Sequence, residues 1–242
     1  MKKKSNLVQV YGKHPVTAAL LNNNRIHREL VTTREILSQL EGKLPKYDLK
    51  ISIKTPKEID VLAPNATHQN IVLYTSSIIS RDSHVLKKIS KKEKSAIIAL
   101  DQVTDPQNIG AIIRSALAFN IDALILPEHS APDETPAMVK ASSGAIEKLP
   151  IIKVKNLTNT IKLLQKENYW AIGLDSNTST LINNHNFGEK TVLIMGSEGK
   201  GMRRLTKETC DLVVKLPMSD KAESLNVSNA AAIAMYELFK NL

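Results

Sequence analysis

The chain has 242 residues, 42% of them hydrophobic, and a formal net charge of +9. This is ample for a hydrophobic core, in one large domain or two smaller ones. The single cysteine, Cys210, excludes an internal disulfide framework and fits a reducing compartment. No apolar run approaches the roughly 20 residues of a membrane span, and the start lacks the apolar core of a signal peptide. We expect a soluble cytoplasmic protein.

The positive charge is concentrated in the first part of the chain. Residues 1–94 contain 18 Lys and Arg against 8 Asp and Glu, a net of +10, whereas residues 95–242 contain 15 against 16, a net of −1. A polyanion partner is expected because neutralising phosphates releases counterions; a merely solubilising surface is the alternative. Since aromatic side chains are scarce here, contacts to RNA shape and backbone are expected. The candidate residues are Lys13, Arg25, Arg28 and Arg34.

In chain order, residues 1–77 are predicted to form a small α/β domain. Short strands are expected at 7–11, 29–32, 50–54 and 71–75, and short helices at 16–21, 35–41 and from Pro56 onward. The histidines at 14, 27 and 68 lack the close spacing of metal ligands, so we expect no metal site. Residues 78–94 are a dense basic run, which predicts a linker with some helical content.

Residues 95–242 alternate apolar runs with helical stretches, which predicts a second α/β domain. Asn108 is the expected N-cap of a helix over 109–119, and Ser228 that of an Ala-rich helix over 229–239. Arg114 follows directly after the apolar stripe of the first of these helices, which is otherwise uncharged. An arginine so close to the edge of a core is expected either to form an ion pair or to bind an anion. The other expected elements are strands at 95–100, 123–126, 151–154 and 170–174, a helix at 157–167 and an apolar run at 210–216.

A glycine-rich segment follows the apolar run at 192–195. It holds Gly196, Gly199 and Gly201, three of only nine glycines, with Glu198 among them. This pattern is typical of a buried parallel strand that ends where backbone must approach a ligand closely. A tight turn that needs glycine only for its positive φ has the same pattern.

Two familiar phosphate-binding loops do not fit this segment. A P-loop needs lysine after its last glycine, where this chain has Met202. A Rossmann fingerprint that starts at Gly199 needs a third glycine where this chain has Arg204. The segment therefore belongs to another ligand-binding design.

Three stretches follow one another along the second domain: Asn108-Ile-Gly-Ala-Ile-Ile-Arg114, Met195-Gly-Ser-Glu-Gly-Lys-Gly-Met-Arg203 and Ser224-Leu-Asn-Val-Ser228. Together, and in this order, they resemble motifs 1, 2 and 3 of the SpoU (TrmH) family of RNA ribose 2′-O-methyltransferases. The opening Tyr11-Gly-Lys-His-Pro-Val-Thr-Ala-Ala-Leu20 resembles the small, ribosomal-protein-like RNA-binding domain of the RlmB-like members. Each motif alone is weak, but three in register are highly specific.

The resemblance implies a fold, a cofactor, a partner and a site. Family members have a SPOUT-type α/β catalytic domain with a mostly parallel sheet and a deep trefoil knot, act as homodimers and use S-adenosylmethionine. The resemblance places the catalytic domain at residues 95–242. It implies cofactor contacts at Met195, Gly196, Gly201, Leu216 and Leu225, and catalytic polar groups at Asn108, Arg114, Glu198, Ser224 and Asn226.

The implied substrate is a guanosine of large-subunit ribosomal RNA, and tRNA is the alternative substrate. A non-catalytic RNA-binding dimer is the alternative function. The family casts the arginine at position 114 as the base, but arginine is a poor base because its guanidinium is already protonated in proteins. We expect Arg114 to hold the adjacent phosphate, which takes the proton. Glu198 would orient Arg114 or the partner motif, and Asn108, Ser224 and Asn226 would position the ribose.

Overall fold

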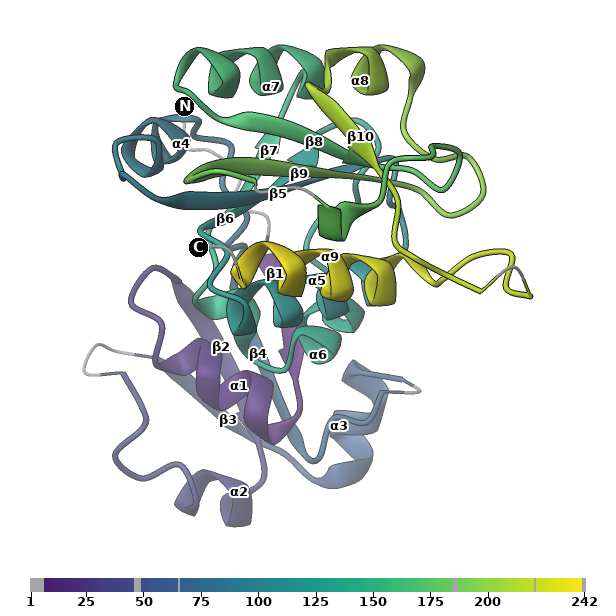
Figure 1. Cartoon of the computed structure of the whole chain (residues 1–242). Helices are drawn as coiled ribbons and strands as arrows, with labels where there is room; N and C mark the ends of the chain where they lie inside the picture. The colour runs from purple at the N-terminus through teal and green to yellow at the C-terminus, as the bar shows by residue number, and fades with distance from the viewer. Residues whose placement is uncertain (1–6, 46–48, 65, 185–186, 220, 241–242) are drawn as a thin grey trace.

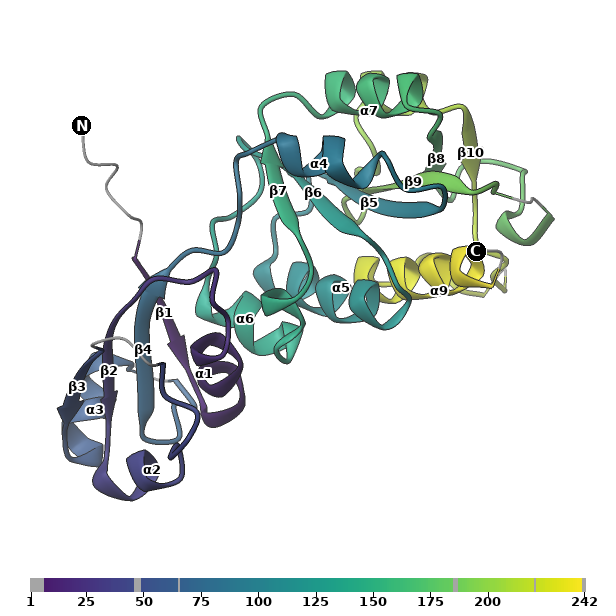
Figure 2. The same cartoon turned by 90° about the vertical axis from the view of Figure 1, so that its left-hand side faces the viewer.

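The structure, a computed structural model, describes residues 7–45, 49–64, 66–184, 187–219 and 221–240. They form two α/β domains, each built on one sheet, which pack against each other (Figure 1 and Figure 2). No helix within these ranges is long and apolar enough to cross a membrane.

The first domain is a four-stranded sheet with short helices. Its elements are β1 Leu7–Tyr11, α1 Lys13–Leu20, β2 His27–Thr32, α2 Arg34–Ser38, β3 Lys50–Ile53, α3 Pro56–Leu62 and β4 Ile71–Ser76. The strand order is β1-β4-β2-β3, with β4 antiparallel to both neighbours and β2 parallel to β3. α3 begins at Pro56, as predicted, because Thr55 and Glu58 form a capping box around its first turn.

The second domain contains a six-stranded sheet in which every described strand pair is parallel. Its strands are β5 Ser95–Asp101, β6 Ala123–Pro127, β7 Ile151–Val154, β8 Trp170–Leu174, β9 Lys190–Gly196 and β10 Leu212–Val214. The order is β10-β8-β9-β5-β6-β7, so β5 and β9 lie at the centre. Parallel strands buried on both faces have continuous apolar runs, which is why the sequence predicted them.

Helices cover both faces of this sheet. They are α4 His84–Ile89, α5 Pro106–Ala118, α6 Pro136–Ser142, α7 Leu157–Lys166, α8 Arg204–Thr209 and α9 Val227–Phe239, with short 3₁₀ turns η1 Ala145–Glu147 and η2 Ile182–Asn184. Ile98 and Leu193 share a core with α5, α6 and α9, whereas their neighbours Ile97 and Val192 share one with α4 and α7. Figure 2 shows these two groups of helices on opposite sides of the sheet.

Two helices begin earlier than the sequence predicted. The N-cap of α5 is Asp105, not Asn108: the Asp105 side chain accepts a hydrogen bond from a backbone N–H of the first turn. The N-cap of α9 is Asn226, not Ser228, because the Asn226 side chain accepts from the Ser228 N–H at 2.9 Å. Asn226 therefore has a capping role that was not predicted, and Asn108 lies inside the first turn of α5.

Residues 78–94 are packed against the second domain and are not a free linker. Leu86 and Ile89 of α4 are buried against the sheet, while the lysines of α4 are exposed. Ser80 extends the sheet beside β7, since its N–H donates to the Ile151 carbonyl at 2.9 Å. Lys87 and Lys88 of the basic run thus lie on the outer face of a short amphipathic helix, which a count of charges does not reveal.

The connection between β8 and β9 lies against the chain as it leaves β10. The Lys215 N–H donates to the Thr180 carbonyl at 2.8 Å, and the Lys215 carbonyl accepts from the Ile182 N–H at 2.9 Å. Ile182 and Phe187 of this connection are buried in the same core as α9. The trefoil knot, in which the chain would thread through this connection, stays a prediction.

Candidate active site

The carboxyl ends of the two central strands carry the glycine-rich segment. β5 ends at Asp101 and β9 ends at Gly196, and these two residues are paired across the sheet. The chain runs outward from β5 through β6 and β7 and then returns to β8 on the other side. Ligands of open α/β sheets bind beyond the carboxyl ends, where the strand order changes direction. The segment therefore lies at the expected place for a ligand.

Residues 197–203 fold back tightly on the end of β9. The Gly201 N–H donates to the Ser197 carbonyl at 2.9 Å, and the Ser197 N–H donates back to the Gly201 carbonyl at 3.2 Å. A Cβ at Gly196 would lie only 2.1 Å from the backbone carbon of Gly201. Gly199 and Gly201 have φ values of 79° and 67°, which favour glycine. The loop conformation itself therefore requires these glycines.

Asp101, which was not among the predicted site residues, anchors the far end of this loop. Its buried carboxylate accepts from the Arg203 backbone N–H at 2.9 Å and from Arg203 Nε at 2.7 Å. Such charge-assisted bonds offset the cost of burying a carboxylate. The available signal was an acidic residue directly after an apolar strand.

Asn108 and Asn226 join the first and third family stretches. Asn226 Nδ2 donates to Asn108 Oδ1 at 3.1 Å. The other end of the Asn226 amide is held as well, because its Oδ1 accepts from the hydroxyl of Ser228 at 2.6 Å. Two of the five predicted catalytic side chains are thus in direct contact and fixed in orientation.

The other three predicted catalytic residues point to solvent. Arg114 lies on α5, Glu198 in the glycine-rich loop and Ser224 just before α9, and all three are exposed. Within the described ranges, none of their side chains has a hydrogen-bond or ion-pair partner. A single chain therefore does not bring Glu198 into contact with Arg114.

The residues predicted to hold the cofactor border one buried corner of the second domain. Met195 and Leu216 are buried in one core, Leu225 packs against it, and Gly196 and Gly201 frame the adjoining loop. In the described part of the chain, the peptide N–H groups of Leu216 and Leu225 have no hydrogen-bond partner. Peptide groups left open beside apolar side chains suit a ligand with a flat ring and polar edges. The residues present thus fit S-adenosylmethionine.

Arg25 does not take the RNA-contacting role predicted for it. Its side chain is buried between Glu134 and Glu147, with N–O distances of 2.6 and 2.7 Å. Although burial opposes the charge, the Glu147 hydrogen bond and both carboxylates raise the pKa of Arg25. A buried, paired guanidinium is not available to phosphates. The sequence around Arg25 does not show whether its side chain is buried or exposed.

The other predicted RNA contacts are more accessible. Arg28 and Arg34 are exposed. Lys13 is half-buried at the start of α1, and its Nζ donates to Gln39 Oε1 at 3.1 Å. Contact of these three residues with RNA stays a prediction.

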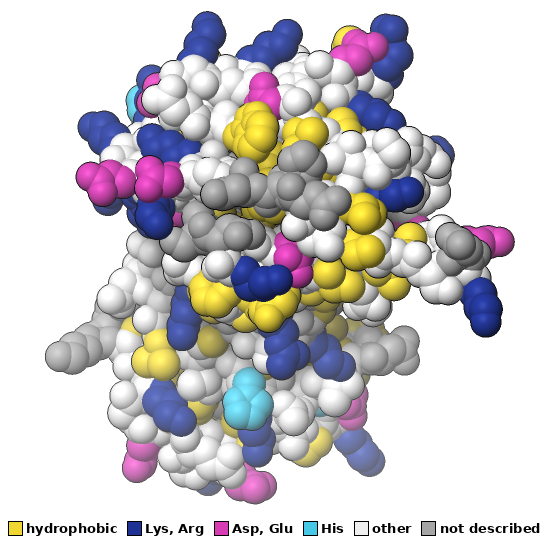
Figure 3. All heavy atoms as spheres, viewed as in Figure 1, with side chains coloured by type: hydrophobic (Ala, Val, Ile, Leu, Met, Phe, Trp, Pro, Cys, Tyr) yellow, Lys and Arg dark blue, Asp and Glu magenta, His cyan; other side chains and the backbone are white. Residues whose placement is uncertain are grey.

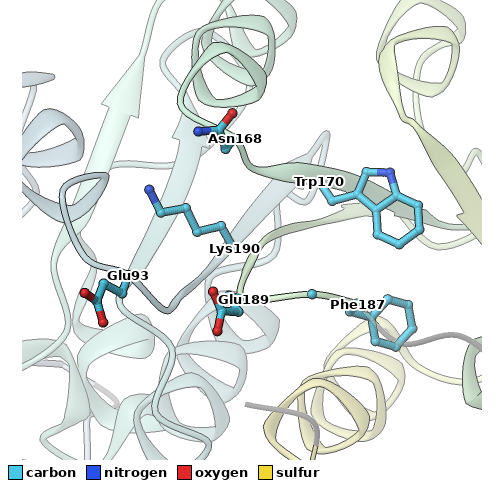
Figure 4. A pocket seen from close by; sticks show the side chains of 7 residues that line it. Glu93, Asn168, Trp170, Phe187, Glu189 and Lys190 are labelled. Atoms are coloured by element: carbon cyan, nitrogen blue, oxygen red, sulfur yellow. The ribbon is translucent and has the colours of Figure 1, made fainter.

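A hollow of about 630 Å³ lies at the opposite edge of the sheet, where β8 and β9 begin. Trp170 and Phe187 lie on one side of it, and Glu93, Asn168 and Lys190 on the other (Figure 4). Lys190 is engaged there, since its Nζ donates to a backbone carbonyl of α4's C-terminal end at 2.8 Å. Because the hollow is at the amino ends of the strands, we do not assign the methyl donor to it.

Comparison with known proteins identifies the family. Residues 95–236 match the SpoU rRNA methylase family, and residues 9–81 match the substrate-binding domain of RNA 2′-O ribose methyltransferases. The chain belongs to the SpoU methylase family. It is therefore an RNA ribose 2′-O-methyltransferase whose methyl donor is S-adenosylmethionine.

Relatives match along nearly their whole length. The chain is 36% identical over 240 residues to the 23S rRNA (guanosine-2′-O-)-methyltransferase RlmB of Coxiella burnetii, covering 97% of this chain and 96% of that one. It is 36% identical to a putative TrmH family tRNA/rRNA methyltransferase of Staphylococcus aureus strain MSSA476, covering 96% and 95%.

Solved structures agree on the fold. The SpoU methyltransferase AviRb of Streptomyces viridochromogenes, in complex with the cofactor AdoMet, has a TM-score of 0.85 at 24% identity, covering 99% of this chain and 91% of that one. The AdoMet-bound rRNA methyltransferase of Sinorhizobium meliloti has a TM-score of 0.84 at 22% identity, covering 100% and 90%. The predicted α/β architecture with a mostly parallel sheet is confirmed.

Arg203→Ala is expected to weaken S-adenosylmethionine binding about tenfold. Loss of a charge-assisted hydrogen bond costs roughly 1.5–3 kcal/mol, and part of this free energy stabilises the loop conformation that binds the cofactor. Isothermal titration calorimetry measures the affinity. The matched control is Arg204→Ala, since Arg204 is next in the chain and its ion-pair partner among the described residues is the exposed Glu208. Equal affinities of the two variants would contradict an anchoring role for the Arg203 side chain, whose bond to Asp101 is the one that the substitution removes.

Proposed function

We propose that this protein methylates the ribose 2′-hydroxyl of a guanosine in large-subunit ribosomal RNA. The observation that carries the proposal is 36% identity, along nearly the full length of both chains, to a relative named for that reaction. tRNA is the second candidate substrate, because the Staphylococcus aureus relative is named a tRNA/rRNA methyltransferase. The reducing cytoplasm is the proposed location, in keeping with the one free cysteine of the chain.

Bound S-adenosylmethionine would supply a methyl group activated by a sulfonium centre, so the protein has to align the ribose and manage its hydroxyl proton. Arg114, an exposed cation on a long helix, holds the phosphate beside the target ribose and stabilises negative charge on the 2′-oxygen. The phosphate takes the proton, because a guanidinium, which already carries its proton, does not accept one. Asn108, Asn226 and Ser224 position the ribose. Glu198, which does not contact Arg114 within one chain, orients either the arginine of a second copy or the partner motif.

The substrate is tested with purified protein, S-adenosylmethionine and either 23S ribosomal RNA or bulk tRNA. We expect methyl transfer to one guanosine of the ribosomal RNA, mapped by the resistance of 2′-O-methylated sites to alkaline cleavage. Transfer to tRNA alone would replace the proposed substrate by the second candidate. Transfer to neither RNA would favour a non-catalytic RNA-binding dimer.

Arg114→Lys is expected to lower turnover at least 100-fold, which is roughly the effect of removing one hydrogen-bond donor to the transition state. The affinity for RNA is expected to change by less than about threefold. Lysine keeps the positive charge but loses the planar fork that grips phosphate through two donors. Single-turnover methyl transfer and mobility-shift titration measure the two quantities. Arg204→Lys, at an exposed arginine, is the control, and full activity of Arg114→Lys would exclude the proposed role.

An apolar surface on α5 and α9 supports a homodimer. Leu117 on α5 and Ile233, Tyr236 and Phe239 on α9 are between 37% and 48% exposed. Hydrophobic side chains gather over α9 in the space-filling view (Figure 3), and a contiguous exposed patch of this kind marks an interaction surface. Arg114 is three residues before Leu117 and so lies on the same side of α5. A second copy seated here would therefore meet the catalytic helix.

Ile233→Glu is expected to raise the dimer dissociation constant at least 100-fold, roughly the effect of removing a central interface residue and burying a charge in its place. Because Ile233 is 43% exposed, the variant should still fold. Sedimentation velocity over a concentration series measures dissociation. Leu163→Glu on α7, where the side chain is 62% exposed, is the control. Dimers of unchanged affinity would assign the interface elsewhere.

A further inference from the structure

A buried ionic cluster lies where the two domains meet. Arg25, between α1 and β2, donates from NH2 to Glu134 Oε1 at 2.6 Å and to Glu147 Oε1 at 2.7 Å, and from Nε to Glu147 Oε2 at 2.7 Å. The Arg25 and Glu134 side chains have no exposed area, and the Glu147 side chain is 4% exposed. One guanidinium of the first domain thus binds two carboxylates of the second.

The same cluster fixes the chain as it crosses between the domains. Arg25 NH1 donates to the carbonyl of Ser76, the last residue of β4, at 2.7 Å. Glu134 Oε2 accepts from the Ser77 hydroxyl at 2.9 Å and from the Ile78 N–H at 2.8 Å. Hinges work through a few connecting residues whose backbone angles are free to change. Here three consecutive connecting residues are each held by a buried charge.

The cluster is one helix away from the catalytic helix. Glu134 lies just before α6 and Glu147 in η1 just after it, and α6 lies between the first domain and α5 (Figure 2). α6 and α5 approach closely: a Cβ at Gly110 of α5 would lie 2.5 Å from the Met138 carbonyl oxygen of α6. Packing this tight transmits position from α6 to the helix that carries Arg114.

We propose that Arg25 is a positioning residue: the Arg25–Glu134–Glu147 cluster holds the RNA-binding domain in one orientation, so that RNA bound there presents its ribose at Arg114. The proposal rests on the proposed function. Buried ion pairs add little net stability but favour one geometry, because a guanidinium fork matches two carboxylates in one arrangement only. The residue thus acts on how RNA is aligned and not on the methyl donor.

The test compares the full-length wild type with the triple variant Arg25→Met, Glu134→Gln, Glu147→Gln. Replacing all three residues avoids leaving an unpaired buried charge, which in Arg25→Met alone would threaten folding. We expect the KM for RNA to rise about tenfold or more, while kcat changes by less than about threefold and the Kd for S-adenosylmethionine by less than about twofold. Arg204→Met with Glu208→Gln, which removes an exposed ion pair, is the control.

Small-angle X-ray scattering of the same proteins measures the domain arrangement without RNA. We expect a larger maximum dimension for the triple variant than for the wild type or the control. An unchanged KM for RNA, or a KM rise accompanied by equal loss of methyl-donor affinity, would overturn the proposal. A wild type that methylates no RNA would instead refute the proposed function, and the scattering comparison would still decide whether the cluster fixes the domains.

Discussion

The parallel pairing of β5 and β9 determines where every other part of the site lies. The two strands are in register from Ser95 and Lys190 to Asp101 and Gly196. Because both are buried on both faces, a slip of one residue would turn every side chain to the wrong core. In the observed register the Asp101 carboxylate meets the end of the glycine-rich loop, and α5 starts a few residues beyond it. α9 packs beside α5, which brings the third family stretch to the same edge.

The parts of this arrangement that depend on local pattern could be predicted from the sequence. The apolar run at 192–195 predicts a strand, and β9 spans Lys190–Gly196, because an apolar run that ends in a glycine-rich turn is typical of a buried parallel strand. The glycine-rich loop was recognised because its backbone angles and close contacts exclude other residues. By contrast, the contact between Asn108 and Asn226 spans 118 positions, and only the family resemblance suggested that the two residues share a site.

What could not be predicted depends on burial and on long-range partners. Arg25 and Arg28 are three letters apart, yet one is buried in an ionic cluster and the other is exposed. The glutamates that decide this are more than 100 residues away in the chain. The N-caps of α5 and α9 were predicted wrongly for a more local reason. Asp, Asn and Ser are all good N-cap residues, so the residue type alone does not distinguish between neighbouring candidates. Asp101 was passed over because its partner, Arg203, is likewise distant in sequence.

The site separates into groups that the fold holds and groups that it leaves open. Asp101, Arg203, Asn108 and Asn226 are fixed by hydrogen bonds within the chain. Arg114, in the described part of the molecule, has no such partner. An internal carboxylate on Arg114 would have to be displaced before a phosphate could bind, and that displacement would cost part of the binding free energy. Arg114 is carried on a rigid helix and, within the described residues, holds no internal ion pair. Binding of a phosphate therefore does not have to break one. The division therefore suits a site in which the protein prearranges the loop and the amides, and RNA supplies the last counter-charge.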